Sequence, residues 1–377
     1  MKVSSIYFGG LKLACVSACI FSVLQARAEA DKVTLVRARE VVVGKITKDD
    51  RDGLEIEIRD RSGAAKRTFN SNEVAEIEWD VSEEGFHEGG AAFHNGSFER
   101  AADLFGGIAN QPDAMNRVRA IARPYVLYMH AESLFRAGKA ADAYTAYQKL
   151  IEGAKNSRYA PYALSNMADA AIQAKTFDKV PALLAQLREG GPEQKQLADY
   201  YEAEALLAQG KAKEAATKYM NAVAGGPGRI RAMALVGQAR AQAASGDSVK
   251  ARELAQQALT LNPPDLTAAR AHVIIGDAAL SDADSKKLSG TQLQDALLDA
   301  ILSYLRVQNQ YPADSATEGY ALLKIGECFK RLSKLPSRAA SDDRERAMSA
   351  FGRIASERRF ANSDLPNLAS KHMEEMK

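Results

Sequence analysis

The feature that most constrains the fold of this chain is a stretch of small residues that returns at a fixed interval. The stretch from Ala203 to Pro227 reads AEALLAQGKAKEAATKYMNAVAGGP, and a similar one, ARAQAASGDSVKARELAQQALTLNP, runs from Ala239 to Pro263. Alanine and glycine recur at matching places 36 residues apart. Helices can approach closely where both carry small side chains, and a period of this length holds one helix pair. The pattern therefore predicts helix pairs stacked in series.

Further helix pairs can be placed on the same frame along most of the chain. The predicted units begin near residues 82, 124, 161, 196, 232, 269 and 319. The last two carry insertions around residues 281–291 and 334–342, and a final helix at 365–376 is expected to cap the stack. One such unit cannot bury its apolar face alone, so neighbouring units must share a continuous core.

The spacing of small and aromatic residues resembles the tetratricopeptide repeat. That family places a small residue, a turn glycine, an alanine, an aromatic residue, a second alanine and a proline along its 34-residue unit. In the stretch quoted first, these places are taken by Ala203, Gly210, Ala215, Tyr219, Ala222 and Pro227. The resemblance implies a mainly α fold, a right-handed α-solenoid of about seven helix pairs whose concave surface binds partners.

Residues 31–80 differ, because apolar and polar residues alternate there with a period of two. Leu54, Ile56 and Ile58 fall on one face of such a strand. Turn-forming residues separate about five short strands. A sheet this small has exposed edges unless it closes, so we expect a small five-stranded β-barrel. The order of the strands and the bend at Gly44, Lys45 and Ile46 resemble Sm-like barrels. The expected organisation is thus a signal peptide at 1–30, the barrel at 31–80 and the solenoid with its capping helix at 81–377.

The first 30 residues have the three parts of a secretory signal peptide. Two lysines precede a 12-residue apolar core, LACVSACIFSVL, and Ala28 and Ala30 supply the small residues of a cleavage site before Asp31. An exported, periplasmic or extracytoplasmic protein is therefore expected. The alternative is a lipoprotein anchored through Cys19, because the residues before that cysteine resemble a lipoprotein box.

Cleavage before Asp31 also changes the charge and cysteine balance. It would reduce Lys plus Arg from 50 to 47 and Asp plus Glu from 48 to 47, which leaves a formally neutral chain. A neutral chain has no electrostatic footprint for nucleic acid. Cys328 would be the remaining cysteine, which rules out an internal disulfide and favours a small buried side chain. No later segment is apolar enough to cross a membrane.

Signals for chemistry are absent from the sequence. The chain has no nucleophile elbow, phosphate-binding loop, dinucleotide fingerprint or zinc-protease motif. His87 and His94 are seven residues apart, a poor spacing for a metal site without further ligands. We therefore expect no enzymatic activity, no cofactor and no metal.

The most specific functional signal is the predicted lining of the groove. In the family resembled here, positions 2, 5, 9 and 12 of the first helix face the concave side. These positions supply acids and tyrosines, which we predict to form a partner-binding groove: Tyr125, Tyr128, Glu132, Tyr162, Asp169, Tyr200, Glu204, Asp277, Tyr320 and Glu327. Solvated helix acids and packing tyrosines would give the same pattern. The expected function is a scaffold or adaptor of the cell envelope that binds a protein or peptide, with a preference for basic segments. The alternative is a peptidoglycan or carbohydrate binder whose tyrosines stack on sugar rings.

Overall fold

The computed structural model describes residues 30–377, apart from 38, 61–62, 226–227, 312–314, 337–339 and 362. The predicted signal peptide and the alternative lipid anchor at Cys19 lie outside the described residues, except for Ala30. The chain divides into two compact units, residues 1–163 and 164–377. Helices dominate both units, and the first also contains an antiparallel sheet, which confirms the predicted fold class.

The sheet consists of β1 (Asp31–Leu35), β2 (Val41–Asp49), β3 (Gly53–Asp60), β4 (Gly63–Asn70) and β5 (Val74–Glu78). Its strand order is β4-β3-β2-β1-β5, and every pair is antiparallel. The long β3–β4 hairpin places Leu54 opposite Phe69. Since side chains alternate between the two faces of a strand, Leu54 and Ile56 both point to the buried face, as the sequence predicts.

The apolar face of the sheet is covered by helices of the same unit. Val33, Leu54 and Ile56 are fully buried, in one cluster with Trp79 and the helical residue Phe105. Among the described residues no backbone pairing joins the edge strands β4 and β5, so the five strands are observed as a sheet and not as the closed barrel that the sequence predicts. Closure is not needed to bury the face, because the helices do so. The predicted boundary at residue 80 stays a prediction.

Buried carboxylates attach the sheet to segments that connect the helices. The fully buried carboxylate of Asp31 accepts hydrogen bonds from the backbone of Ile46 and Asp80, and it pairs with Arg119. At the other end of the sheet, Arg158 Nε lies 2.6 Å from an oxygen of Asp49.

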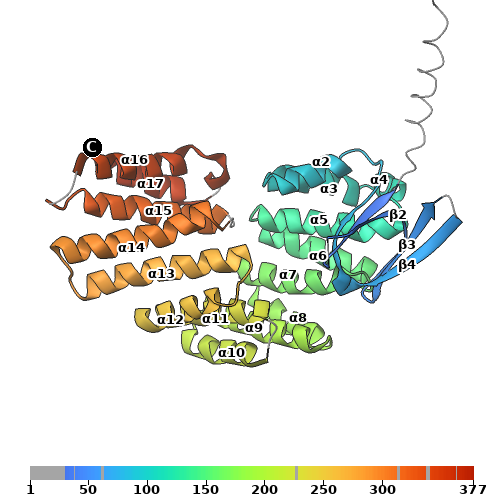
Figure 1. Cartoon of the computed structure of the whole chain (residues 1–377), viewed down its shortest axis with the longest axis horizontal. Helices are drawn as coiled ribbons and strands as arrows, with labels where there is room; N and C mark the ends of the chain where they lie inside the picture. The colour runs from blue at the N-terminus through green and yellow to red at the C-terminus, as the bar shows by residue number, and fades with distance from the viewer. Residues whose placement is uncertain are drawn as a thin grey trace, which may run out of the picture. The chain divides into compact units, whose positions relative to one another are not determined.

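The helices of the first unit lie alongside this sheet (Figure 1). They are α2 (Phe86–His94), α3 (Phe98–Ala109), α4 (Pro112–Arg117), α5 (Arg123–Arg136) and α6 (Ala140–Ala154), and the boundary between the units falls within α7 (Ala160–Gln173). The pairs α2–α3 and α5–α6 correspond to the first two predicted repeats.

The second unit consists of stacked antiparallel helices (Figure 1). They are α8 (Val180–Arg188), α9 (Pro192–Ala208), α10 (Ala212–Gly225), α11 (Gly228–Ala244), α12 (Ser248–Leu259), α13 (Asp265–Ser285), α14 (Gly290–Asn309), α15 (Ser315–Leu332), α16 (Ala340–Ser356) and α17 (Leu365–Glu374). The insertion predicted around residues 281–291 lengthens α13 and α14. Only the turn between Ser285 and Gly290 is not helical.

The small residues of the repeat lie where the helices meet. Ala203 on α9 and Ala215 and Ala222 on α10 are all 0% exposed, as is Tyr219 between them. Gly210 separates the two helices with φ at 79°, a left-handed conformation that glycine adopts without strain. The predicted stop at Pro227 lies outside the described residues.

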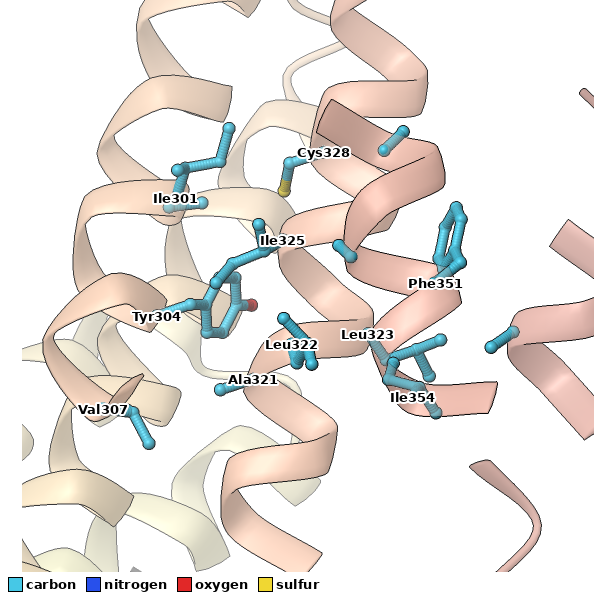
Figure 2. Packing of buried hydrophobic residues seen from close by; sticks show 14 of the residues in the cluster. Ile301, Tyr304, Val307, Ala321, Leu322, Leu323, Ile325, Cys328, Phe351 and Ile354 are labelled. Atoms are coloured by element: carbon cyan, nitrogen blue, oxygen red, sulfur yellow. The ribbon is translucent and has the colours of Figure 1, made fainter. Parts of the chain in front are cut away.

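The last repeats share one continuous buried cluster. Figure 2 shows Tyr304 of α14, Leu322 and Ile325 of α15, and Phe351 of α16 gathered between their helices. Cys328 lies in the same cluster, and burial raises the pKa of its thiol to about 12. Its predicted role as a small buried side chain is confirmed.

Candidate functional site

A pocket of about 800 Å³ lies within the second unit. Its lining comes mainly from α7, α9, α11, α13 and α15, which are the first helices of five successive pairs. First helices repeat the same face from unit to unit, because each pair has the same internal packing. The side chains that line the pocket are therefore those at equivalent positions of consecutive repeats.

One of these equivalent positions carries an acid that binds the tyrosine of its own repeat. The hydroxyl of Tyr219 on α10 donates to Glu204 on α9 at 2.6 Å, and that of Tyr304 on α14 donates to Asp277 on α13 at the same 2.6 Å. In the first unit, Tyr147 donates to Glu132 over 2.6 Å as well. These distances are typical of hydrogen bonds to an ionised acceptor. The acid thus has a structural partner within its repeat, which the sequence analysis did not foresee.

Glu204 also pairs with a base from the next repeat. Nη1 of Arg240 on α11 lies 2.9 Å from one oxygen of Glu204 and 3.0 Å from the other. Burial alone would raise the pKa of Glu204, but Arg240 and the hydroxyl of Tyr219 outweigh it and the pKa is lowered. The negative charge of Glu204 in turn raises the pKa of Arg240. This pair is ionised at neutral pH and closes part of the pocket wall.

Asp169 on α7 occupies the same repeat position but has no such partner. Its repeat carries Leu184 on α8 where Tyr219 and Tyr304 stand in theirs, so a hydroxyl is missing. The hydrogen bond that it receives comes from the amide of Gln173, one turn later on the same helix, at 3.2 Å. Burial, and secondarily the nearby negative charge of Glu204, raise the pKa of Asp169 to about 6. It is the least compensated acid of the pocket.

Asp277 has more partners than Asp169. Besides Tyr304, the hydroxyl of Tyr320 on α15 lies 3.1 Å and 3.2 Å from its two oxygens. Burial still raises the pKa of Asp277, against the opposing effect of both hydroxyl groups. Two neutral hydroxyl donors therefore stabilise the ionised form of this carboxylate.

The pocket is balanced in charge rather than purely acidic. Its ionisable lining consists of three acids, Asp169, Glu204 and Asp277, and three bases, Lys175, Arg240 and Arg270. Arg270 and Lys175 were missed by the sequence analysis. Arg270 stands at position 2 of its repeat, which the repeat frame places on the concave side. A search of that position for basic residues as well as tyrosines would have identified it.

Four predicted groove residues line this pocket, namely Asp169, Glu204, Asp277 and Tyr320. Tyr200 differs from its prediction, because it is only 6% exposed and its ring packs against Tyr201 and Tyr219. Glu327 is not part of the lining. Lys324 and His372 lie 2.8 Å and 3.4 Å from it, so it takes part in the packing of the last repeats.

The remaining predicted residues belong to the first unit. Tyr125 and Tyr128 are half-buried and contact Tyr159, with ring centroids 5.9 Å and 5.3 Å apart. Glu132 is 6% exposed and held by Tyr147 and Arg136. Tyr162 is 54% exposed and is the one predicted groove tyrosine among the exposed large hydrophobic side chains. Packing within the unit therefore occupies three of these four side chains.

Chemical signals other than the pocket are few in the described part of the chain. Within it, no group of three or more His, Cys, Asp and Glu side chains is arranged to hold a metal ion. None of the described helices combines the length and the apolar character that a membrane span requires.

One family model and several solved structures are similar to parts of this chain. The family model described as tetratricopeptide repeat matches residues 125–157. No curated protein matches the chain. A solved tetratricopeptide repeat protein from Parabacteroides merdae is 15% identical with a TM-score of 0.43, over 76% of this chain and 98% of that one.

Two further solved structures are similar to this chain at comparably low sequence identity. The human IFIT1 dimer with m7Gppp-AAAA is 16% identical with a TM-score of 0.42, over 76% of this chain and 66% of that one. The Cut9–Hcn1 complex is 14% identical with a TM-score of 0.35, over 78% of this chain and 72% of that one. Such low identities and TM-scores carry no functional argument. The matched residues 125–157 contain α6 and nearly all of α5, and this helix pair is therefore identified as a tetratricopeptide repeat.

Proposed function

We propose that this protein is a non-enzymatic scaffold or adaptor that binds a segment of a partner protein in the pocket of its second unit. The observation that carries the proposal is the pocket itself, which five successive repeats line with both acids and bases. Repeat arrays commonly use such recurring first-helix surfaces for partners. The pocket also has apolar walls, which include Ile172, Phe177 and Val273. Apolar surface beside a few oriented polar groups is typical of a binding site.

The setting that we propose is outside the cytoplasm, in the cell envelope. It rests on the signal-like sequence of residues 1–30, which ends at Ala28 and Ala30. Cleavage there is compatible with the fold, because β1 begins at Asp31 and every strand would remain. N-terminal sequencing of the exported protein tests this: Asp31 should come first, whereas a modified Cys19 would favour the lipoprotein.

A protein partner is better supported than a sugar. Stacking on sugar rings requires open aromatic faces, but Tyr200 is buried and Tyr125 and Tyr128 pack against Tyr159. Of the predicted tyrosines in the first unit, Tyr162 is the one whose ring is exposed enough to stack on a sugar. The charged and apolar lining of the pocket suits a peptide segment instead.

Site-specific photocrosslinking in the producing cell tests the proposed function. A photoreactive amino acid at Ser281, an exposed residue of the pocket lining, should form a discrete adduct with a partner protein. The same group at Gln257, exposed on α12 and outside the lining, serves as the control. Equal adducts at both positions, or none at Ser281, would contradict binding in the pocket.

A further inference from the structure

The inference concerns what enters the pocket beside Asp169, and it rests on the proposed function. A carboxylate has about four acceptor sites when it is ionised. The bond that Asp169 receives is a single one, from Gln173 to Oδ1, and within the described part of the chain it forms no ion pair. The other oxygen of Asp169 therefore has capacity for a donor, in a pocket large enough to admit one.

The electrostatic surroundings favour a positive donor. Glu204 lies close enough to Asp169 for its negative charge to raise the pKa of the latter. The bases nearby are Arg240, which is bound to Glu204, and Arg270, which acts on both acids. These bases counteract the effects of burial and of Glu204 on Asp169 only in part, since its pKa remains raised. A cation that binds Asp169 would remove much of the cost of burying that charge.

The apolar side chains that line the same pocket as Asp169 suit the stem of a long basic side chain. Ile172 follows on the same helix, Phe177 begins the short 3-10 helix after α7, and Val273 lines the pocket from α13. Lysine and arginine lay their methylene groups along apolar surface while their charged ends reach a polar partner. A pocket that combines an acid with apolar walls matches such a side chain.

We propose that a lysine or arginine side chain of the partner segment enters the pocket, lies along Ile172 and Phe177, and forms an ion pair with Asp169. Glu204 is already paired with Arg240 and Tyr219, and Asp277 already accepts two tyrosine hydroxyls. Asp169 is therefore the acid that specifies the basic residue, while the other two maintain the wall of the pocket.

An octapeptide library, with every residue type at each position, tests this on the whole purified protein. Peptides retained by the protein should be enriched in lysine or arginine at one position. Asp169→Asn should weaken binding of a retained basic peptide about tenfold or more, because a charge-assisted hydrogen bond contributes roughly 1.5–3 kcal/mol. Asp295→Asn, an exposed change on α14, should leave the affinity unchanged. Asp277→Asn should weaken the binding of this peptide less than Asp169→Asn does.

A charge exchange separates a direct ion pair from a general loss of negative charge. Asp169→Lys should reject the basic peptide and bind the same peptide with glutamate in place of its basic residue. Circular dichroism of each variant provides the folding control. If Asp169→Asn binds as well as the parent protein, or if the exchange restores nothing, the ion pair is overturned.

The failure of the inference can be distinguished from failure of the proposed function. Ser281→Trp adds bulk at the pocket lining and should block retained peptides of any composition. If Ser281→Trp blocks binding but the peptides show no basic enrichment, the pocket binds partners and the proposed role of Asp169 is wrong. If no peptide is retained, or if Ser281→Trp has no effect, both proposals are overturned.

Discussion

Two repeats of the second unit use the same acidic position in opposite ways. In the α13–α14 repeat, Asp277 accepts hydrogen bonds from Tyr304 and Tyr320. In the α7–α8 repeat, Leu184 replaces the tyrosine, and the bond to Asp169 comes from Gln173. In the first case the tyrosine of the repeat itself and one from the next repeat satisfy the acid. A repeat without that hydroxyl leaves acceptor capacity facing the pocket, so the position where the repeat pattern fails is where we expect binding.

The largest expected effect comes from disrupting the satisfied repeat. A Cβ at Gly276 would lie 2.6 Å from Cζ of Tyr304, closer than real Cβ contacts allow. Gly276→Ala should therefore displace the buried ring and its hydroxyl from Asp277, and lower the free energy of unfolding by about 3 kcal/mol. Urea unfolding measures this loss.

Gly352 on α16 is the matched control for that change. Nothing lies within 4 Å of the position of its Cβ. Gly352→Ala should leave stability unchanged or raise it by up to about 1 kcal/mol, because alanine favours a helix over glycine. Similar losses for both variants would mean that the ring contact has no special role.

A smaller effect is expected from removing only the hydroxyl of the satisfied repeat. Tyr304→Phe keeps the ring and removes a 2.6 Å bond to Asp277, which should lower the free energy of unfolding by about 2 kcal/mol. Tyr219→Phe should cost less, because Glu204 keeps its ion pair with Arg240. Chemical denaturation measures the free energy of unfolding of both variants. A larger loss for Tyr219→Phe than for Tyr304→Phe would contradict the bonding described for the two repeats.

The smallest effect, and one of opposite sign, is expected at the unsatisfied repeat. Asp169 has a pKa of about 6 in the folded protein against an ordinary value of 3.8. Its ionised form therefore destabilises the fold above pH 6, and this penalty is relieved as the pH falls through 6 towards 3.8. Asp169→Asn removes this penalty but also replaces the charged acceptor of the Gln173 bond by a neutral one, so the net gain in the free energy of unfolding at pH 7.5 should be on the order of 1 kcal/mol. The gain should be smaller at pH 5. A loss of stability at pH 7.5 would show that Asp169 is a structural acid like Asp277.

Much of the fold could be predicted because it follows from local spacing. Small residues such as Ala203 and Ala215 mark helix contacts at any depth of the array, and alternation in β3 marks a strand with one buried face. Closure of the sheet could not be predicted, since the residues that cover its face, such as Phe105, are distant in sequence.

The candidate site could be predicted only in part for a related reason. The repeat frame places Asp169, Glu204 and Asp277 on equivalent faces, and all three line one pocket. The frame does not show which acids are already bonded, because that depends on the tyrosine of the second helix. Nor does it show that Tyr200 is buried, since a tyrosine at a groove position can also fill a packing layer.

The most direct test of this account is the titration of Asp169 itself. Carbon NMR of protein labelled at aspartate carboxyl groups, with Asp169→Asn to assign the signal, gives its pKa in the free protein. We predict a value of about 6, because burial and the charge of Glu204 oppose ionisation. Addition of a retained basic peptide should lower that pKa, because a bound cation favours the ionised carboxylate. A pKa near 3.8 in the free protein would show that Asp169 is already satisfied and would contradict the account.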